Sequence, residues 1–180
     1  MKLLSQLDDI LNVIKTSEMG DDINENYRML LLSALSEEFN AWYFYLITRP
    51  YIIGEHFKDI RNLFEETAKD ELEDHAYWLM ERINQLGYKI DDIAHPSSWA
   101  NLAEHKYVKP IFNENGNIDP KTILEQAIQS ELDAIETYTN LCEFTNAIKD
   151  STSNLKLRQI LADEEEHLSD LKDIYESIKK

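Results

Sequence analysis

Apolar side chains along this chain recur every three or four residues, the spacing that places them on one face of an α-helix. Residues 3 to 17 follow this spacing, so we predict a short N-terminal helix within residues 1–19, ended by Gly20. The same pattern over longer stretches predicts four further helices, at residues 24–48, 55–86, 120–149 and 152–178. Strand-like alternation is absent from these stretches, so the expected class is all-α.

Turn-forming residues separate the expected helices. Pro50 and Gly54 follow the first long helix, and Gly87 is expected to end the second. Asp119 and Pro120 are typical of an N-cap and a first helical residue. The first and second helices, and the third and fourth, are joined by short links, whereas residues 88–117 form a long connection. This layout predicts an antiparallel four-helix bundle with one long crossover.

Length and composition narrow the picture further. At 180 residues, with four Gly and four Pro, the chain fits a single helical domain covering residues 1–180. The formal net charge of -17 disfavours nucleic acid and anionic membranes and favours cations. The single cysteine, Cys142, excludes an internal disulfide and a four-thiolate metal site, and we expect it to be a buried small hydrophobe. Without an apolar run long enough for a leader or a membrane span, the expected location is the cytoplasm.

Candidate chemistry comes from charged residues on apolar helix faces, where a charge is costly unless it is paired or bound to metal. Each long helix has one such carboxylate, and two helices add a histidine about one turn later. The candidates are Glu38, Glu71, His75, Glu131, Glu164 and His167. Each of them alone is more simply explained by a salt bridge or a hydrogen-bonded core histidine. Their combination on four helices favours metal.

An internal repeat supports this combination. Glu38 precedes Glu71 by 33 residues (71 minus 38), and Glu131 precedes Glu164 by 33 (164 minus 131). The first helix of each pair also reads Glu, then Ala three residues on, then Tyr seven residues on, which ends at Tyr45 and Tyr138. Four carboxylates facing one another could not all remain ionised without cations, and two divalent metals would balance them. Oxygen-rich ligands with imidazole suit iron or manganese better than structural zinc.

This ligand set resembles that of the ferritin-like di-iron family: one Glu from each of two helices, and Glu plus a nearby His from each of the other two. The resemblance covers about Tyr27 to Ile178, and the segment 131–133 and the run DEEEH resemble the non-haem bacterioferritin and Dps-like branches. It implies two Fe ions per subunit, with Mn as an alternative metal. Tyr45 and Tyr138 are either core aromatics or partners of the ligand carboxylates.

One spacing departs from the family pattern. Glu164 and His167 fit Glu-x-x-His, but Glu71 and His75 are one residue further apart. A one-residue π-bulge would return both side chains to the metals. Alternatively Glu73 or Asp74 replaces Glu71, or this half binds metal weakly; the 33-residue interval favours Glu71.

Other departures concern cofactors and assembly. Bacterioferritins carry a haem-ligating Met directly after the second-helix Glu, where this chain has Leu72, so no haem is expected. Only 13 residues (180 minus 167) follow His167, too few for the fifth helix of 24-subunit ferritins. The resemblance therefore implies a homo-oligomer, either a dodecameric cage or a smaller assembly. We expect His56, His95 and His105 to be surface or loop residues, and the Trp99 segment of the crossover to cover the bundle or meet a neighbouring subunit.

The resulting functional hypothesis is a ferroxidase that oxidises Fe(II) with dioxygen or hydrogen peroxide, for iron storage and protection from oxidative stress. Glu71 and Glu164 would bridge the metals. A first alternative keeps the site but changes the reaction, to a di-iron or di-manganese peroxidase or catalase without storage. A second is a non-enzymatic, acidic helical interaction protein.

Overall fold

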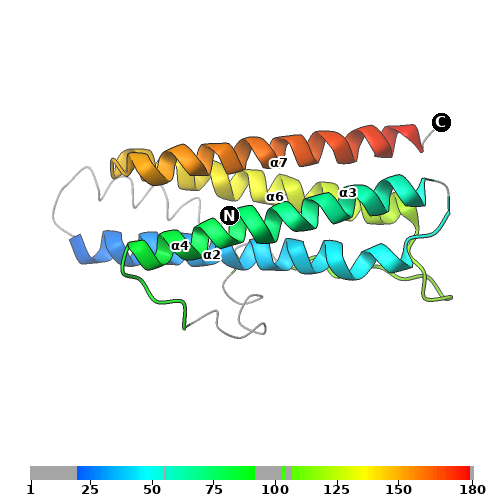
Figure 1. Ribbon diagram of the computed structural model, residues 1–180, viewed down its shortest axis with the longest axis horizontal. Helices are drawn as coiled ribbons and strands as arrows, with labels where there is room; N and C mark the ends of the chain where they lie inside the picture. Colours follow the sequence, from blue (N-terminus) through cyan, green and yellow to red (C-terminus); the bar gives the residue numbers. More distant parts are fainter. Residues whose placement is uncertain (1–19, 55, 92–102, 104–106, 179–180) are drawn as a thin grey trace.

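Long helices lie side by side in this protein, parallel to the long axis of the molecule (Figure 1). The computed structural model describes residues 20–54, 56–91, 103 and 107–178. Four long helical segments occur among these residues, and the all-α class and four-helix bundle expected from the sequence are confirmed. They are α2 (Gly20–Thr48), the continuous run of α3 (Phe57–Lys69), η2 (Asp70–Ala76) and α4 (Tyr77–Gln85), then α6 (Pro120–Ala147) and α7 (Ser151–Ser177).

The chain forms two antiparallel hairpins. In Figure 1, α2 runs in the opposite direction to α3, η2 and α4, and α6 runs in the opposite direction to α7. The short 3₁₀ helix η1 (Arg49–Tyr51) lies in the first link. After the long connection the chain returns to this end of the bundle, where Ile52 and Ile118 form an isolated parallel bridge. The connection therefore spans the length of the bundle before α6 begins.

Local sequence accounts for the ends of the helices. The Asp119 side chain accepts a hydrogen bond from the Thr122 backbone N–H at 2.9 Å, and Pro120 occupies the first turn of α6, as the sequence predicts. Gly87 has φ +79°, a left-handed conformation that suits glycine and ends α4. The start of α2 differs from expectation, because residues 20–22 are already helical. The expected helix within residues 1–19 lies outside the described residues.

The apolar interior has two parts, one towards each end of the bundle. One part contains Leu31, Leu79 and Phe144, and the other contains Phe44, Phe64 and Leu171. A layer of buried charged and polar side chains lies at the level between them. The two apolar parts exclude water from this layer above and below, so its charges must be compensated by one another or by bound ions.

At one end a polar network joins the two hairpins. The Arg82 guanidinium donates to both carboxylate oxygens of Asp150, at 3.0 and 2.8 Å, and the Tyr27 hydroxyl donates to the same carboxylate at 2.9 Å. Ser153 adds a backbone and a side-chain hydrogen bond to Asp150. The turn between α6 and α7 is thereby fixed to α4 and α2.

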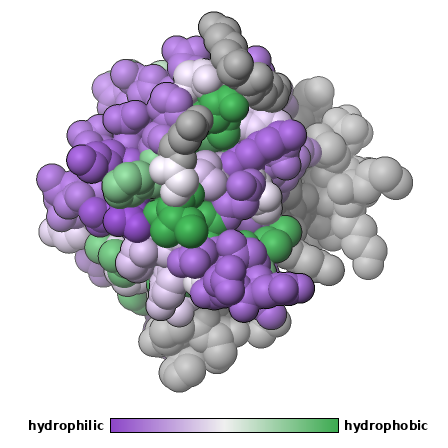
Figure 2. Space-filling model, turned by 90° about the vertical axis from the view of Figure 1, so that its right-hand side faces the viewer, coloured by the Kyte–Doolittle hydropathy of each residue, from purple (hydrophilic) through white to green (hydrophobic). Residues whose placement is uncertain are grey.

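The opposite end carries several exposed apolar side chains. Figure 2 looks onto this end and shows hydrophobic groups in green among hydrophilic side chains in purple. Tyr51 and Phe112, which stack edge to face at 5.3 Å, are 46% and 44% exposed. They lie near the point where η1 and the end of the long connection approach each other.

Candidate metal centre

Helices α2 and α6 each direct one glutamate into the polar layer. Glu38 is 3% exposed and Glu131 is 1% exposed. Two turns further along each helix lies a buried tyrosine, and the pairing crosses the bundle: the Tyr45 hydroxyl donates to Glu131, and the Tyr138 hydroxyl donates to Glu38. Each tyrosine thus holds the glutamate of the other hairpin.

The second helix of each hairpin directs a glutamate and a histidine into the same layer. All four side chains are buried. His75 Nδ1 lies 3.0 Å from Glu71 Oε2 and 3.1 Å from Glu164 Oε1. His167 Nδ1 lies 3.5 Å from Glu164 Oε2 and 3.7 Å from Glu71 Oε1. The structure therefore brings the six residues singled out in the sequence into one cluster.

Within this cluster the ligand atoms form two groups. Glu38, Glu71, His75 and Glu164 place one donor atom each within 4.8 Å of one another, and so do Glu71, Glu131, Glu164 and His167. Glu71 and Glu164 belong to both groups. Their carboxylates are therefore within reach of both groups of donor atoms.

The π-helical segment η2 accommodates the unusual spacing of Glu71 and His75. It contains both residues, and its wider turn holds the extra residue so that both side chains face the cluster. Glu73 and Asp74 are exposed, and Asp74 accepts a charge-assisted hydrogen bond from Lys156 Nζ at 2.8 Å. The structure thus places Glu71, rather than Glu73 or Asp74, beside the other three buried glutamates, whereas Asp74 belongs to a separate and more exposed group with His75 and Asp163.

Two aspartates that the sequence analysis did not single out lie behind the histidines. His75 Nε2 is 3.5 Å from Asp163 Oδ2 on α7, and His167 Nε2 is 3.5 Å from Asp70 Oδ2 on η2. A metal-binding histidine usually presents its other ring nitrogen to a carboxylate, which fixes the tautomer. Each aspartate directly precedes a cluster glutamate, so a repeated Asp-Glu pair was the available signal.

Burial and the proximity of like charges favour protonation of several groups in the cluster. Burial raises the pKa of Glu71, and the negative charges of Glu164 and Glu38 raise it further. Burial and the charge of Glu164 likewise raise the pKa of Glu131. Burial alone would lower the pKa of His75, but hydrogen bonding to Glu164, Glu38 and Glu71 outweighs it and the pKa rises. Burial and mutual repulsion thus disfavour the simultaneous ionisation of these carboxylates.

The carboxylate of Glu164 behaves in the opposite way. Burial alone would raise its pKa, but the adjacent His167 and His75 outweigh this effect and lower the pKa. Burial alone would lower the pKa of His167, but the hydrogen bond to Glu164 and the charge of Glu164 outweigh burial and raise it. The neighbouring imidazoles of His75 and His167 therefore favour the ionised form of Glu164.

Buried polar atoms that lack hydrogen-bond partners show whether this set of residues suits a metal ion. Several buried atoms that could bind a metal have no hydrogen-bond partner among the described residues. They include Glu38 Oε2, Glu71 Oε1, both carboxylate oxygens of Glu164, and His167 Nδ1. Buried polar atoms normally have a hydrogen-bond partner, and a gathering of buried atoms without one is what a metal-binding site requires. Carboxylate oxygens combined with imidazole nitrogens match the preferences of iron and manganese. The residues present fit iron binding.

The remaining histidines and the cysteine are placed as follows. His56 is an exposed residue, and its Nδ1 lies 3.5 Å from Asp59 Oδ2. His95, His105 and Trp99 lie outside the described residues. Cys142 is buried, as expected. In the part of the chain that the structure describes, no helix is long and apolar enough to cross a membrane.

Known proteins share this fold and its sequence features. A structure of a dodecameric thioferritin, the bacterioferritin-related protein of Bacteroides fragilis, superposes with a TM-score of 0.80 at 31% identity, covering 96% of this chain and 95% of that one. The Dps of Thermosynechococcus elongatus shares the fold alone, with a TM-score of 0.75 at 18% identity over 85% and 92% of the two chains.

Sequence comparison agrees with the structural one. The DNA protection during starvation protein of Pyrococcus furiosus is 30% identical over 149 residues, which cover 82% of this chain and 75% of that relative. The family model described as a ferritin-like domain matches residues 29–180. The chain belongs to the ferritin-like family.

Proposed function

We propose that this protein is a ferroxidase that binds two Fe(II) ions as substrate in the buried cluster and oxidises them. The two overlapping donor groups, which share Glu71 and Glu164, carry this proposal. Glu38 and His75 would complete one site, and Glu131 and His167 the other. Each site then offers carboxylate oxygens and one imidazole nitrogen, the ligands that ferrous iron accepts.

The oxidation balances with an external oxidant of low molecular mass. Two ferrous ions give up one electron each and become ferric. Hydrogen peroxide accepts these two electrons and two protons, its O–O bond breaks, and two waters form. Dioxygen accepts the same two electrons and two protons and yields hydrogen peroxide. Glu71 and Glu131, whose carboxyl groups have a raised pKa in the cluster, must release their protons when they bind iron, so the two protons consumed in the oxidation come from solvent.

The protein's own side chains would orient this chemistry. Asp163 and Asp70 lie 3.5 Å from the outer nitrogens of His75 and His167, a placement that would orient each ring with its Nδ1 towards a metal. The hydroxyls of Tyr45 and Tyr138 fix the carboxylates of Glu131 and Glu38. The cluster is thus held in place before metal arrives, which limits the reorganisation needed on binding.

We extend the proposal to a homo-oligomeric cage that stores iron and limits oxidative damage. The similarity to a dodecameric relative at 31% identity supports the assembly. The formal net charge of -17 disfavours direct contact with a nucleic acid backbone. Protection of DNA would then result from removal of ferrous iron and peroxide rather than from DNA binding.

Anaerobic Fe(II) titration followed by addition of peroxide or oxygen tests the proposal. We expect about two ions bound per chain, as the two donor groups require, and a rapid rise in ferric absorbance. Glu131→Ala should slow oxidation roughly 100-fold or more, since losing even an outer partner of a ligand costs about 10- to 100-fold. Glu143→Ala, an exposed change on the same helix, is the matched control.

The same experiment contains its refutations. A chain that binds no metal, or a Glu131→Ala variant that oxidises iron at the unchanged rate, would exclude the proposed site. Oxygen evolution from peroxide with manganese bound, without net iron oxidation, would instead identify a catalase. The mass of the particle in solution tests the cage.

A further inference from the structure

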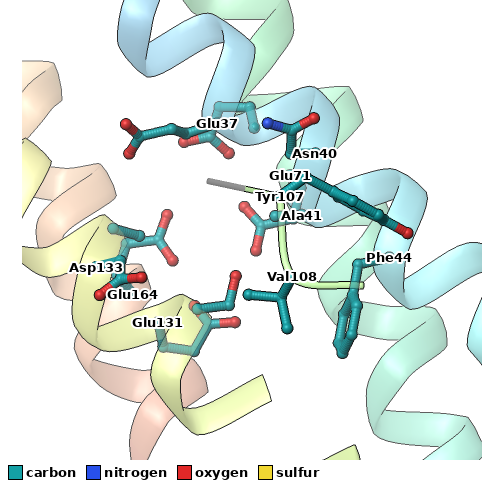
Figure 3. A pocket seen from close by; sticks show the side chains of 13 residues that line it. Glu37, Asn40, Ala41, Phe44, Glu71, Tyr107, Val108, Glu131, Asp133 and Glu164 are labelled. Carbon is teal, nitrogen blue, oxygen red and sulfur yellow. The ribbon is translucent and has the colours of Figure 1, made fainter. Parts of the chain in front are cut away.

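A narrow opening between α2 and α6 leads from the surface to the metal cluster. Its inner end is lined by all four cluster glutamates, and its volume is about 30 Å³. A space of this size holds about one water molecule. Figure 3 shows the carboxylates of Glu71 and Glu131 turned towards this space, with Ala41 on one wall and Val108 of the long connection beside it.

Two alanines related by the internal repeat line the opening. Ala41 follows Glu38 by three residues on α2, and Ala134 follows Glu131 by three residues on α6, so each lies next to a cluster glutamate on the same helix face. Both alanines are partly exposed, whereas the glutamates are buried. Their methyl groups therefore stand between solvent and the cluster, and they leave space that a longer side chain would fill.

The outer part of the opening is acidic. Glu37 accepts a hydrogen bond from the Thr137 hydroxyl at 2.7 Å, and Asp133 accepts one from Gln129 Nε2 at 2.7 Å. Both carboxylates line the opening and are partly exposed. Fixed negative charges at the mouth of a narrow, low-dielectric passage concentrate cations there.

The opposite side of the cluster offers a competing route that the geometry disfavours. An open acidic depression of about 340 Å³ lies between the α3–η2 run and α7, with His75 and His167 in its lining. The nitrogens that the two imidazoles present on this side face Asp163 and Asp70. None of the four cluster glutamates lines this depression, so a cation there meets Asp74, Asp163 and the outer side of the His75 ring rather than the cluster carboxylates.

We propose that small divalent cations reach the cluster through the opening between α2 and α6, and that Ala41 and Ala134 set its width. This inference rests on the proposed dinuclear metal site. Glu37 and Asp133 attract the cation, which loses most of its water before it meets the carboxylates, because the passage has room for about one water molecule. Narrowing the passage slows entry and exit equally, so the affinity at equilibrium is unchanged.

Stopped-flow binding of Co²⁺ under anaerobic conditions tests the proposal on the full-length, metal-free protein. Leucine at either alanine, in Ala41→Leu or Ala134→Leu, should lower the rate of Co²⁺ binding at least ten-fold. A chelator chase should show the dissociation rate falling by the same factor, with stoichiometry and Kd unchanged. Ala147→Leu, the same change at a half-buried position near the end of α6, is the control and should behave like the wild type.

The outcomes separate the two proposals. Failure of the wild type to bind Co²⁺ would reject the dinuclear site itself. Wild-type rates in both leucine variants, or an equal slowing in Ala147→Leu, would reject the opening as the route. A variant that loses affinity along with rate would show a structural effect instead and also count against it. If leucine prevents folding, Ala134→Val provides a smaller obstruction with the same expected direction.

The charge at the mouth gives a second readout. The double variant Glu37→Gln and Asp133→Asn should bind Co²⁺ more slowly than the wild type at low salt, and the difference should shrink as salt rises, because ions screen exposed charges. Equal rates for both proteins at all salt concentrations would contradict an electrostatic role for these two residues.

Discussion

The second hairpin presents Glu164 and His167 from a regular α-helix, three residues apart, whereas the first presents Glu71 and His75 from the π-helical segment η2, four residues apart. Up to the second glutamate of each hairpin, corresponding residues in the two hairpins are separated by a constant number of positions. The cluster glutamates Glu71 and Glu164 are 93 residues apart (164 minus 71), but the histidines are 92 apart (167 minus 75). One additional residue in the first hairpin accounts for the change.

Corresponding buried positions in the two hairpins are 93 residues apart before η2 and 92 residues apart after it. Phe64 and Leu157, which are 93 residues apart (157 minus 64), are both fully buried. Leu79 and Leu171, which are 92 apart (171 minus 79), are fully buried as well. The extra residue is therefore absorbed within η2, and the helix continues into α4 with its apolar face still towards the core. A helix can thus accept an insertion at a functional site without turning the rest of its length.

Deleting Glu165 from α7 should produce the largest effect, because this helix has no extra residue to lose. Every residue after the deletion would turn by about 100°. His167 would leave the cluster, and the buried Leu171 would turn away from the core at a cost of about 2–5 kcal/mol. Metal titration should show loss of binding, and circular dichroism should show a much lower Tm. A variant with wild-type metal stoichiometry would contradict the assigned register.

The aspartates behind the histidines should contribute equally in the two halves. Asp163→Asn removes the charge facing His75, and Asp70→Asn removes the charge facing His167. Each variant should weaken the binding of one of the two ions by about 10- to 100-fold and leave the other ion largely unaffected. Co²⁺ titration with calorimetry measures this. Unchanged affinity in either variant would show that the corresponding histidine is oriented by other contacts.

The polar network around Asp150, which joins the two hairpins, should make the stability of the fold depend on pH. Burial alone would raise its pKa, but hydrogen bonds from Ser153 and Arg82 outweigh this and lower it to about 2, against an ordinary value of 3.8. The ionised form is favoured in the folded state, so its stabilisation is complete above pH 4 and is lost as the pH falls towards 2. The difference between the two pKa values corresponds to about 2 kcal/mol.

Urea unfolding of metal-free Asp150→Asn therefore should show about 2 kcal/mol lower stability at pH 7. About half of this difference should disappear by pH 3, since the wild-type carboxylate is then partly protonated in the unfolded state. A difference that is independent of pH would mean that the variant acts through altered packing at the turn and not through the charge.

Deleting Glu73 should have the smallest effect and makes the sharpest comparison with the Glu165 deletion. It removes an exposed residue from η2 and restores in the first hairpin the Glu-x-x-His spacing of the second. We expect two ions still bound, and a Tm within about 4 °C of the wild type, the shift produced by about 1 kcal/mol in a chain of this size. If both deletions abolish metal binding, η2 has a function beyond absorbing one residue.

Much of the fold and the cluster could be predicted because helical periodicity and burial act along short stretches of sequence. Glu38 and Glu131 stand out among apolar neighbours on their own helices, and the equal spacing of the two hairpins joins them to Glu71 and Glu164. The position of His75 suggested a π-bulge for the same reason, and η2 is the element that the structure shows there.

Features that depend on contacts between helices were not predictable. Asp70 and Asp163 are partly or largely exposed residues within acidic runs, so the repeated Asp-Glu pair is the one feature of their own helices that sets them apart from solvated charges. The crossed pairing of Tyr45 with Glu131 joins residues 86 positions apart and appears only once α2 and α6 are placed side by side. The importance of Ala41 and Ala134 likewise comes from the space they leave between two helices.

The crossed tyrosines and the shared glutamates make the metal site dependent on both hairpins, which matters if the chain is cut between them. Each hairpin carries only three of the six metal-binding candidates, and each tyrosine completes the site of the other hairpin. A chain cut within residues 88–117 would yield two fragments with half a site each. Reassociation of these fragments should then depend on divalent metal, because the ions join donors from both. Such a pair of fragments would report the presence of divalent metal by associating with each other.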